Sequence, residues 1–208
     1  MYKVITLTCN RFASYSDEDG TVKLYSSEIY EQIEIPFEQQ IAPNSLIQLK
    51  RQREVLVISS LSGYGHLHFY QLCYPYKLLG AVNKVCTTFS NGLTELSNGH
   101  VVASCYMPNY IYIVDPQTYE LIAIIVDEEY IPMYGPLHTF GNDSYIYVPV
   151  TGGCLCEITM INGEYKISFK TKEIGKEFNG NCIFTINNGK YLISGNKFQG
   201  CSIFNYSC

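Results

Sequence analysis

The sequence predicts an all-β protein built from one unit that recurs about every 45 residues. Short apolar runs stand at this spacing, each between two further apolar runs, and they begin at Phe12, Val57, Val102, Tyr147 and Leu192. Runs of this length that end at turn residues are typical of strands, and helical periodicity is essentially absent. A repeat of roughly 40–45 residues that holds about four strands is typical of a propeller blade. We therefore predict a β-propeller of about five blades, each of four antiparallel strands.

The first strand of each predicted blade is apolar and is followed by a tight turn. These first strands are Val4–Leu7, Leu46–Leu49, Leu93–Leu96, Leu137–Phe140 and Ile183–Ile186. Three of the turns are Asn98-Gly99, Gly141-Asn142 and Asn188-Gly189. They suit two-residue hairpins because Asn and Gly tolerate the positive φ that such hairpins require. The second strand of each blade is the recurring run itself.

The third and fourth strands follow at near-constant offsets. The third strands are Val22–Tyr25, Leu67–Tyr70, Ile111–Val114, Leu155–Ile158 and Cys201–Phe204. The fourth strands are Glu31–Ile35, Leu78–Val82, Leu121–Val126 and Tyr165–Phe169. The fifth unit has no fourth strand, so we predict a last blade that lacks its outer strand.

These boundaries predict one propeller domain over residues 1–208, with blades at approximately 1–43, 44–88, 89–133, 134–178 and 179–208. Three ways of ending the ring remain open. Five blades could close by packing alone, the ring could stay open, or the chain could be part of a longer propeller. An open ring would expose edge strands, which invite pairing with another chain.

Composition limits the classes of function. The formal net charge is −5, which argues against the clustered basic face of a nucleic-acid-binding protein. No apolar run approaches the ~20 residues that span a bilayer, and the start of the chain does not resemble a signal peptide. Nine cysteines, mostly within or beside apolar runs, then favour reduced thiols and a cytoplasmic location.

Blade one resembles a known repeat family. The segment Ala13–Tyr25 contains a small-Ser pair, an acidic turn ending in Asp19-Gly20, then Thr-Val-Lys-Leu and an aromatic residue. This segment resembles the hairpin of a WD40 repeat, with Tyr25 where that family usually has Trp. The other blades resemble WD40 or YVTN propellers in layout alone, since the chain has no Trp and no Gly-His pair before a first strand.

Two residue pairs could bind a metal. Cys154 and Cys156 share one face of a strand, and so do His66 and His68. A zinc site needs about four ligands, and no second pair stands at ligand spacing. The nucleophile, zincin and phosphate-loop motifs are absent from the sequence. We therefore predict no catalytic, cofactor-binding or metal-binding residue, and treat both pairs as structural.

One predicted face of the propeller combines aromatic and acidic residues. The candidate protein-binding residues on its loops are Tyr15, Asp17, Asp19, Tyr64, Tyr106, Met107, Tyr130, Tyr134 and Phe198. Aromatic residues and Met are enriched at protein interfaces, and an acidic rim favours a basic partner. The alternative is that tyrosine, with 19 copies, simply populates every loop.

These observations predict a cytoplasmic, non-catalytic scaffold of the WD40-like type that binds proteins or peptides at this face. The prediction includes no cofactor, no nucleic acid and no membrane, and it allows self-association through an unclosed blade edge. One alternative is a propeller enzyme with its site at the channel mouth. The other is an incomplete propeller that functions only within a larger assembly.

Overall fold

The computed structural model describes residues 2–8, 10–16, 20–29, 31–33, 43–60, 65–86, 88–107, 110–126, 138–140, 145–150, 154–170, 182–186, 191–196 and 200–205. It divides into two compact units, Met1–Phe89 and Ser90–Cys208. Within the described ranges, the regular secondary structure is entirely strand. No helix in this part of the chain has the length and hydropathy needed to cross a membrane.

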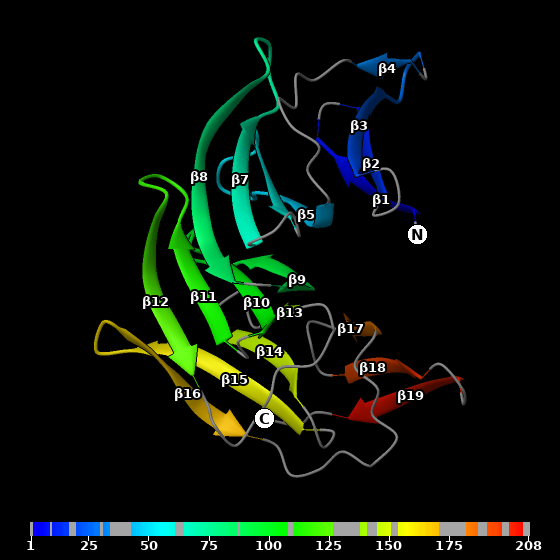
Figure 1. Ribbon diagram of the computed structural model, residues 1–208. Coiled ribbons are helices and arrows are strands. Elements are labelled where there is room, and N and C mark those ends of the chain that lie inside the picture. Colours follow the sequence, from blue (N-terminus) through cyan, green and yellow to red (C-terminus); the bar gives the residue numbers. More distant parts are fainter. Residues whose placement is uncertain are drawn as a thin grey trace. The chain divides into compact units, whose positions relative to one another are not determined.

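The first unit contains two four-stranded antiparallel sheets whose strands lie in chain order (Figure 1). The first sheet consists of β1 (Tyr2–Leu7), β2 (Arg11–Ser16), β3 (Thr21–Ser26) and β4 (Gln32–Ile33). The second consists of β5 (Pro43–Gln48), β6 (Val55–Ser60), β7 (Gly65–Gln71) and β8 (Lys77–Cys86).

The second unit contains two further four-stranded sheets and one of three strands (Figure 1). The first comprises β9 (Thr88–Glu95), β10 (Val101–Met107), β11 (Tyr110–Asp115) and β12 (Glu120–Val126). The next comprises β13 (His138–Phe140), β14 (Tyr145–Val150), β15 (Cys154–Ile161) and β16 (Glu164–Lys170). The three-stranded sheet comprises β17 (Cys182–Ile186), β18 (Tyr191–Asn196) and β19 (Gly200–Asn205).

These sheets confirm the predicted all-β, propeller-like architecture of antiparallel four-stranded units. Each predicted strand falls within or across one of the observed strands, and the fifth sheet has three strands within the described residues. The number of blades in the protein and its organisation as a single domain stay predictions.

The core of the first unit lies between its two sheets. Ala13 pairs with Leu24, and Tyr15 pairs with Val22, so these four buried side chains share one face of the first sheet. They form one cluster with buried residues of the second sheet, namely Leu46, Leu56, Ile58 and Tyr70. Strand β6 is buried along its whole length, as expected of a strand that is apolar on both faces.

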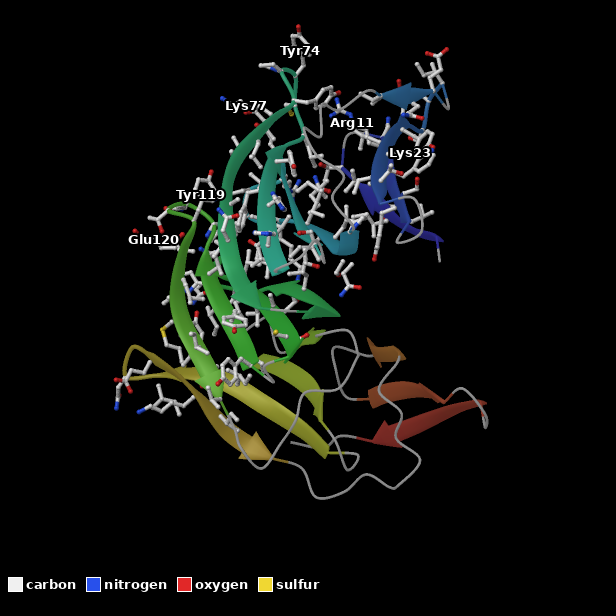
Figure 2. The ribbon with its side chains drawn as sticks, viewed as in Figure 1. Arg11, Lys23, Tyr74, Lys77, Tyr119 and Glu120 are labelled. Atoms are coloured by element: carbon white, nitrogen blue, oxygen red, sulfur yellow. The ribbon has the colours of Figure 1, made fainter. Side chains whose placement is uncertain are left out.

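Polar contacts also join the two sheets of the first unit. The backbone N–H of Thr8 donates to Gln48 Oε1 at 2.8 Å, and Gln48 Nε2 donates to Thr8 Oγ1 at 2.6 Å. Arg11, labelled in Figure 2, donates to the Leu72 carbonyl. Its guanidinium carbon lies 5.8 Å from the ring centroid of Tyr76. These contacts fix the turn after β1 and the start of β2 against the second sheet.

The core of the second unit is built in the same way. Leu96, Val102, Ile111, Ile113 and Ile125 form one buried cluster with Ile158 of the next sheet. Ala123, Tyr165 and Ile167 pack against this cluster. Strands β12 and β16, the outer strands of the two sheets, therefore both send side chains into the shared core.

The turns confirm part of the predicted hairpin chemistry. Gly99 has a φ of 94°, and its N–H donates to the Leu96 carbonyl at 2.8 Å. Gly20 has a φ of 65°, a conformation that glycine adopts without a steric cost. The turns predicted at Gly141-Asn142 and Asn188-Gly189 lie outside the described residues.

Candidate functional site

The predicted binding face falls mostly outside the described residues. Asp17, Asp19, Tyr64, Tyr130, Tyr134 and Phe198 all lie outside the described ranges. Tyr106 and Met107 are the last two residues of β10, and their backbone alone is described. The structure therefore brings none of these eight side chains together within the ranges that it describes.

Tyr15 is the ninth predicted residue, and its side chain is buried. It lies in β2 with an exposed fraction of 6%, within the core of the first unit. Its hydroxyl donates to the backbone carbonyl of Asn44 at 3.3 Å. Tyr15 therefore packs between two sheets and is not presented on a loop.

An exposed apolar surface lies on β12, which is the edge strand of its sheet. We call this surface the β12 edge; it consists of Leu121, Ile122, Ile124 and Val126, exposed by 40%, 44%, 48% and 51%. Glu120, at the start of the strand, is its one charged residue (Figure 2). Exposed apolar residues of this size in one strand are typical of interaction surfaces.

The β12 edge is anchored by its inward-facing side chains. Ile125 is buried, and half-buried Ala123 packs against the same core. Strand β12 pairs with β11 along its length, with a register shift between Ile113 and Val114. Packing thus holds the strand in place while one side of its backbone stays at the sheet edge.

The sequence predicts an outer strand at Leu121–Val126 but no binding site there. The available signal was the run Leu121–Val126, six apolar residues at an outer position where polar alternation is expected.

A hydrogen-bonded group links the first two sheets of the second unit. Asn98 Nδ2 donates to the Tyr165 hydroxyl at 2.6 Å, and that hydroxyl donates to His100 Nδ1 at 2.6 Å. Burial lowers the pKa of His100, an effect that the charge of Asp115 opposes, and burial raises the pKa of Tyr165. Both shifts favour the neutral forms of the two side chains.

The paired histidines of the sequence do lie on one face of β7. The ring centroids of His66 and His68 are 5.8 Å apart, and both side chains are half-buried. Burial, and then the proximity of His66, lower the pKa of His68 to about 4. His68 is therefore neutral at physiological pH.

The cysteines differ in part from the prediction. Cys105, fully buried in β10, is disulfide-bonded, so the expectation of reduced thiols is wrong at this residue. The side chains of Cys154 and Cys156 lie outside the described set. Within that set, no three His, Cys, Asp or Glu side chains are grouped as metal ligands would be.

Comparison with solved structures supports a propeller-like fold. The chain is similar to a dihydro-heme d1 dehydrogenase, NirN, solved in complex with DHE, with a TM-score of 0.70 and 16% sequence identity. The match covers 97% of this chain and 43% of that protein, so the chain spans less than half of its length. No family model and no curated protein matches the sequence. At this identity the likeness concerns the fold alone.

Proposed function

We propose that this propeller-like protein is a non-catalytic interaction scaffold that binds partner proteins or peptides. The observation that carries the proposal is the β12 edge, where four large apolar side chains are 40–51% exposed on an edge strand. Covering each of these half-exposed side chains contributes on the order of 1 kcal/mol to association.

The chemistry of the edge selects one kind of partner, an extended protein segment. The outer side of an edge strand presents backbone N–H and C=O groups, which another strand satisfies directly. Six of the seven residues of β12 are uncharged, so the edge lacks the charges that usually prevent such pairing. We infer that the partner adds a strand beside β12 and places alternate apolar side chains over Ile122, Ile124 and Val126.

The tyrosine-rich, acidic loop face remains a second part of the proposal. Its support is the sequence alone, and it favours a basic partner. The WD40-like relationship likewise rests on the segment Ala13–Tyr25.

A peptide-binding experiment tests the strand-addition mode. Peptides are selected from a random library against the whole chain, and their dissociation constants are measured for the wild type and for Ile124→Lys. The matched control is Ile29→Lys, because Ile29 is also an exposed apolar residue, at 63%, but lies in a turn of the first unit. We expect at least tenfold weaker binding for Ile124→Lys and no change for Ile29→Lys.

Backbone methylation of the selected peptide then tests the pairing itself. N-methylation of alternate amide groups removes hydrogen-bond donors while leaving every side chain in place. We expect methylation on the pairing side to abolish binding and methylation on the opposite side to have little effect. Equal binding of both methylated forms would contradict strand addition. Loss of a wild-type homodimer in Ile124→Lys would identify a second copy as the occupant and overturn the proposed partner class.

A further inference from the structure

A polar cluster in the first unit has no part in the proposed scaffold role. Along β7, Gly65, Leu67 and Phe69 are buried on one face, and His66 and His68 lie on the other. His66 pairs across the sheet with Ser60, and His68 pairs with Ile58. Because Ile58 belongs to the core between the two sheets, the imidazoles share the face that packs against the first sheet.

One ring nitrogen of His66 is held by a hydrogen bond, and the other can bind an ion. Its Nδ1 lies 2.9 Å from Asn83 Oδ1 on the neighbouring strand β8. An amide oxygen can only accept a hydrogen bond, so Nδ1 carries the proton and donates it. The Nε2 atom of a neutral His66 then holds a lone pair. This is the arrangement in which an outer hydrogen bond orients a metal-binding imidazole.

His68 and Ser60 carry unsatisfied polar atoms in the same place. Among the side chains that the structure describes, Ser60 Oγ and His68 Nδ1 are the buried polar atoms that make no hydrogen bond. Leaving such an atom without a hydrogen bond destabilises the folded state. Ser60 and His68 both neighbour His66, one across the sheet and one along the strand, so both unsatisfied atoms belong to one cluster.

The imidazoles lie slightly farther apart than a shared ion requires. A tetrahedral ion bound by two imidazoles at about 2.0–2.1 Å places their ring centroids roughly 5 Å apart. The observed centroid separation is 5.8 Å, so the two rings would have to move closer together to share an ion. Neutral imidazole suits zinc, copper and nickel ions, whereas carboxylates and carbonyls suit calcium and magnesium.

We propose that His66 and His68 form a two-imidazole binding site for a divalent transition-metal ion, with Asn83 as a positioning residue and Ser60 beside the ion. Water completes the coordination. The site lies within one compact unit and is separate from the β12 edge, so either proposal can fail alone.

Nickel titration of the untagged full-length chain tests the site. Ni²⁺ is the probe because cysteine thiolates elsewhere in the chain favour zinc more strongly than nickel. Affinity is measured by calorimetry, and the bound residues are identified by paramagnetic broadening of the imidazole proton signals. We expect the His66 and His68 signals to broaden at lower Ni²⁺ concentration than the His100 signal.

Matched variants separate this site from general histidine binding. We expect His66→Gln and His68→Gln each to weaken Ni²⁺ binding at least tenfold, and Asn83→Ala to weaken it about tenfold. His100→Gln, which removes an imidazole from the other unit, should leave the affinity unchanged. Thermal unfolding identifies any variant that does not fold, and Asn83→Ala, which keeps both imidazoles, then serves in its place. Equal affinity in the wild type and the folded site variants, or simultaneous broadening of all histidines, would overturn the proposal.

Discussion

Strands β12 and β16 are both outer strands of the second unit, and they differ in how their edges are protected. Strand β16 alternates exposed Glu164 and Lys166 with half-buried Tyr165 and Ile167, and Lys166 Nζ lies 2.7 Å from Glu164 Oε2. The hydrogen bond from Lys166 holds the pKa of Glu164 below its usual value. Strand β12 is apolar after Glu120.

The difference indicates which edge is available for pairing. Charged side chains, lysine above all, keep natural edge strands from pairing with other chains. Both strands contribute side chains to the same core, and β12 does so through Ile125 and Ala123, not through the apolar residues that it exposes. Their exposure is the feature that the scaffold proposal explains.

A substitution in the core of this unit should lower stability far more than a substitution at the β12 edge. Ile158→Ala should lower the free energy of unfolding by about 2–5 kcal/mol, because it leaves a cavity in the core that β12 and β16 share. Ile124→Ala should change it by less than about 1 kcal/mol, because that side chain is 48% exposed. Urea unfolding measures both values. Similar losses in the two variants would show that the Ile124 side chain is part of the core.

The hydrogen bonds of Tyr165, in β16, should make the next largest contribution to stability. Tyr165→Phe removes the hydroxyl that accepts from Asn98 and donates to His100, and it leaves two polar groups without this partner. We expect the free energy of unfolding to fall by about 1–3 kcal/mol. Denaturant unfolding at neutral pH provides the measurement, and a change within about 0.3 kcal/mol would mean that the link is not stabilising.

The same contact predicts a pH dependence. Since burial lowers the pKa of His100 in the folded state, the unfolded chain binds a proton more readily. The stabilisation is complete above the ordinary histidine pKa of about 6.5 and is lost as pH falls through the lowered pKa. Unfolding free energies measured from pH 7.5 down to pH 5 should fall less steeply in His100→Gln than in the wild type. Parallel curves would exclude this role for His100.

A smaller effect should follow from removing the charge that protects β16. Lys166→Ile breaks an exposed ion pair, which contributes little to stability because solvent screens it. It also gives β16 an apolar edge like that of β12, so we expect increased self-association in light scattering. Lys166→Gln is the control, because it removes the charge without adding an apolar surface. Equal masses for both variants and the wild type would show that charge does not govern this edge.

More of the fold than of the sites could be predicted, because apolar runs and turn residues mark the strands locally in the sequence. Gly99 adopts the positive φ that the Asn-Gly pair predicts, and the apolar run of β6 is buried throughout. The sequence predicts a loop at Tyr15, but β2 continues to Ser16. Tyr15 therefore pairs with Val22 and its side chain points into the core. Along a strand, a shift by one residue moves a side chain to the opposite face of the sheet.

The contact between His66 and Asn83 could not be predicted for a related reason. The pairing of β7 with β8 shifts register between Gly65 and Leu67, so the opposite residue cannot be found by counting along the strands. The exposure of Leu121, Ile122, Ile124 and Val126 also depends on how other parts of the chain pack, which the residues of β12 do not specify. The disulfide at Cys105 depends on the spatial approach of another cysteine.

Hydrogen–deuterium exchange tests whether a bound peptide pairs with β12 as an added strand. Exchange is followed across the second unit, with and without a saturating selected peptide. Strand addition predicts slower exchange of the β12 amides, Glu120–Val126, on binding, and unchanged exchange in β16, Glu164–Lys170. Unchanged exchange in β12 while the peptide is bound would show that the peptide does not add a strand at this edge.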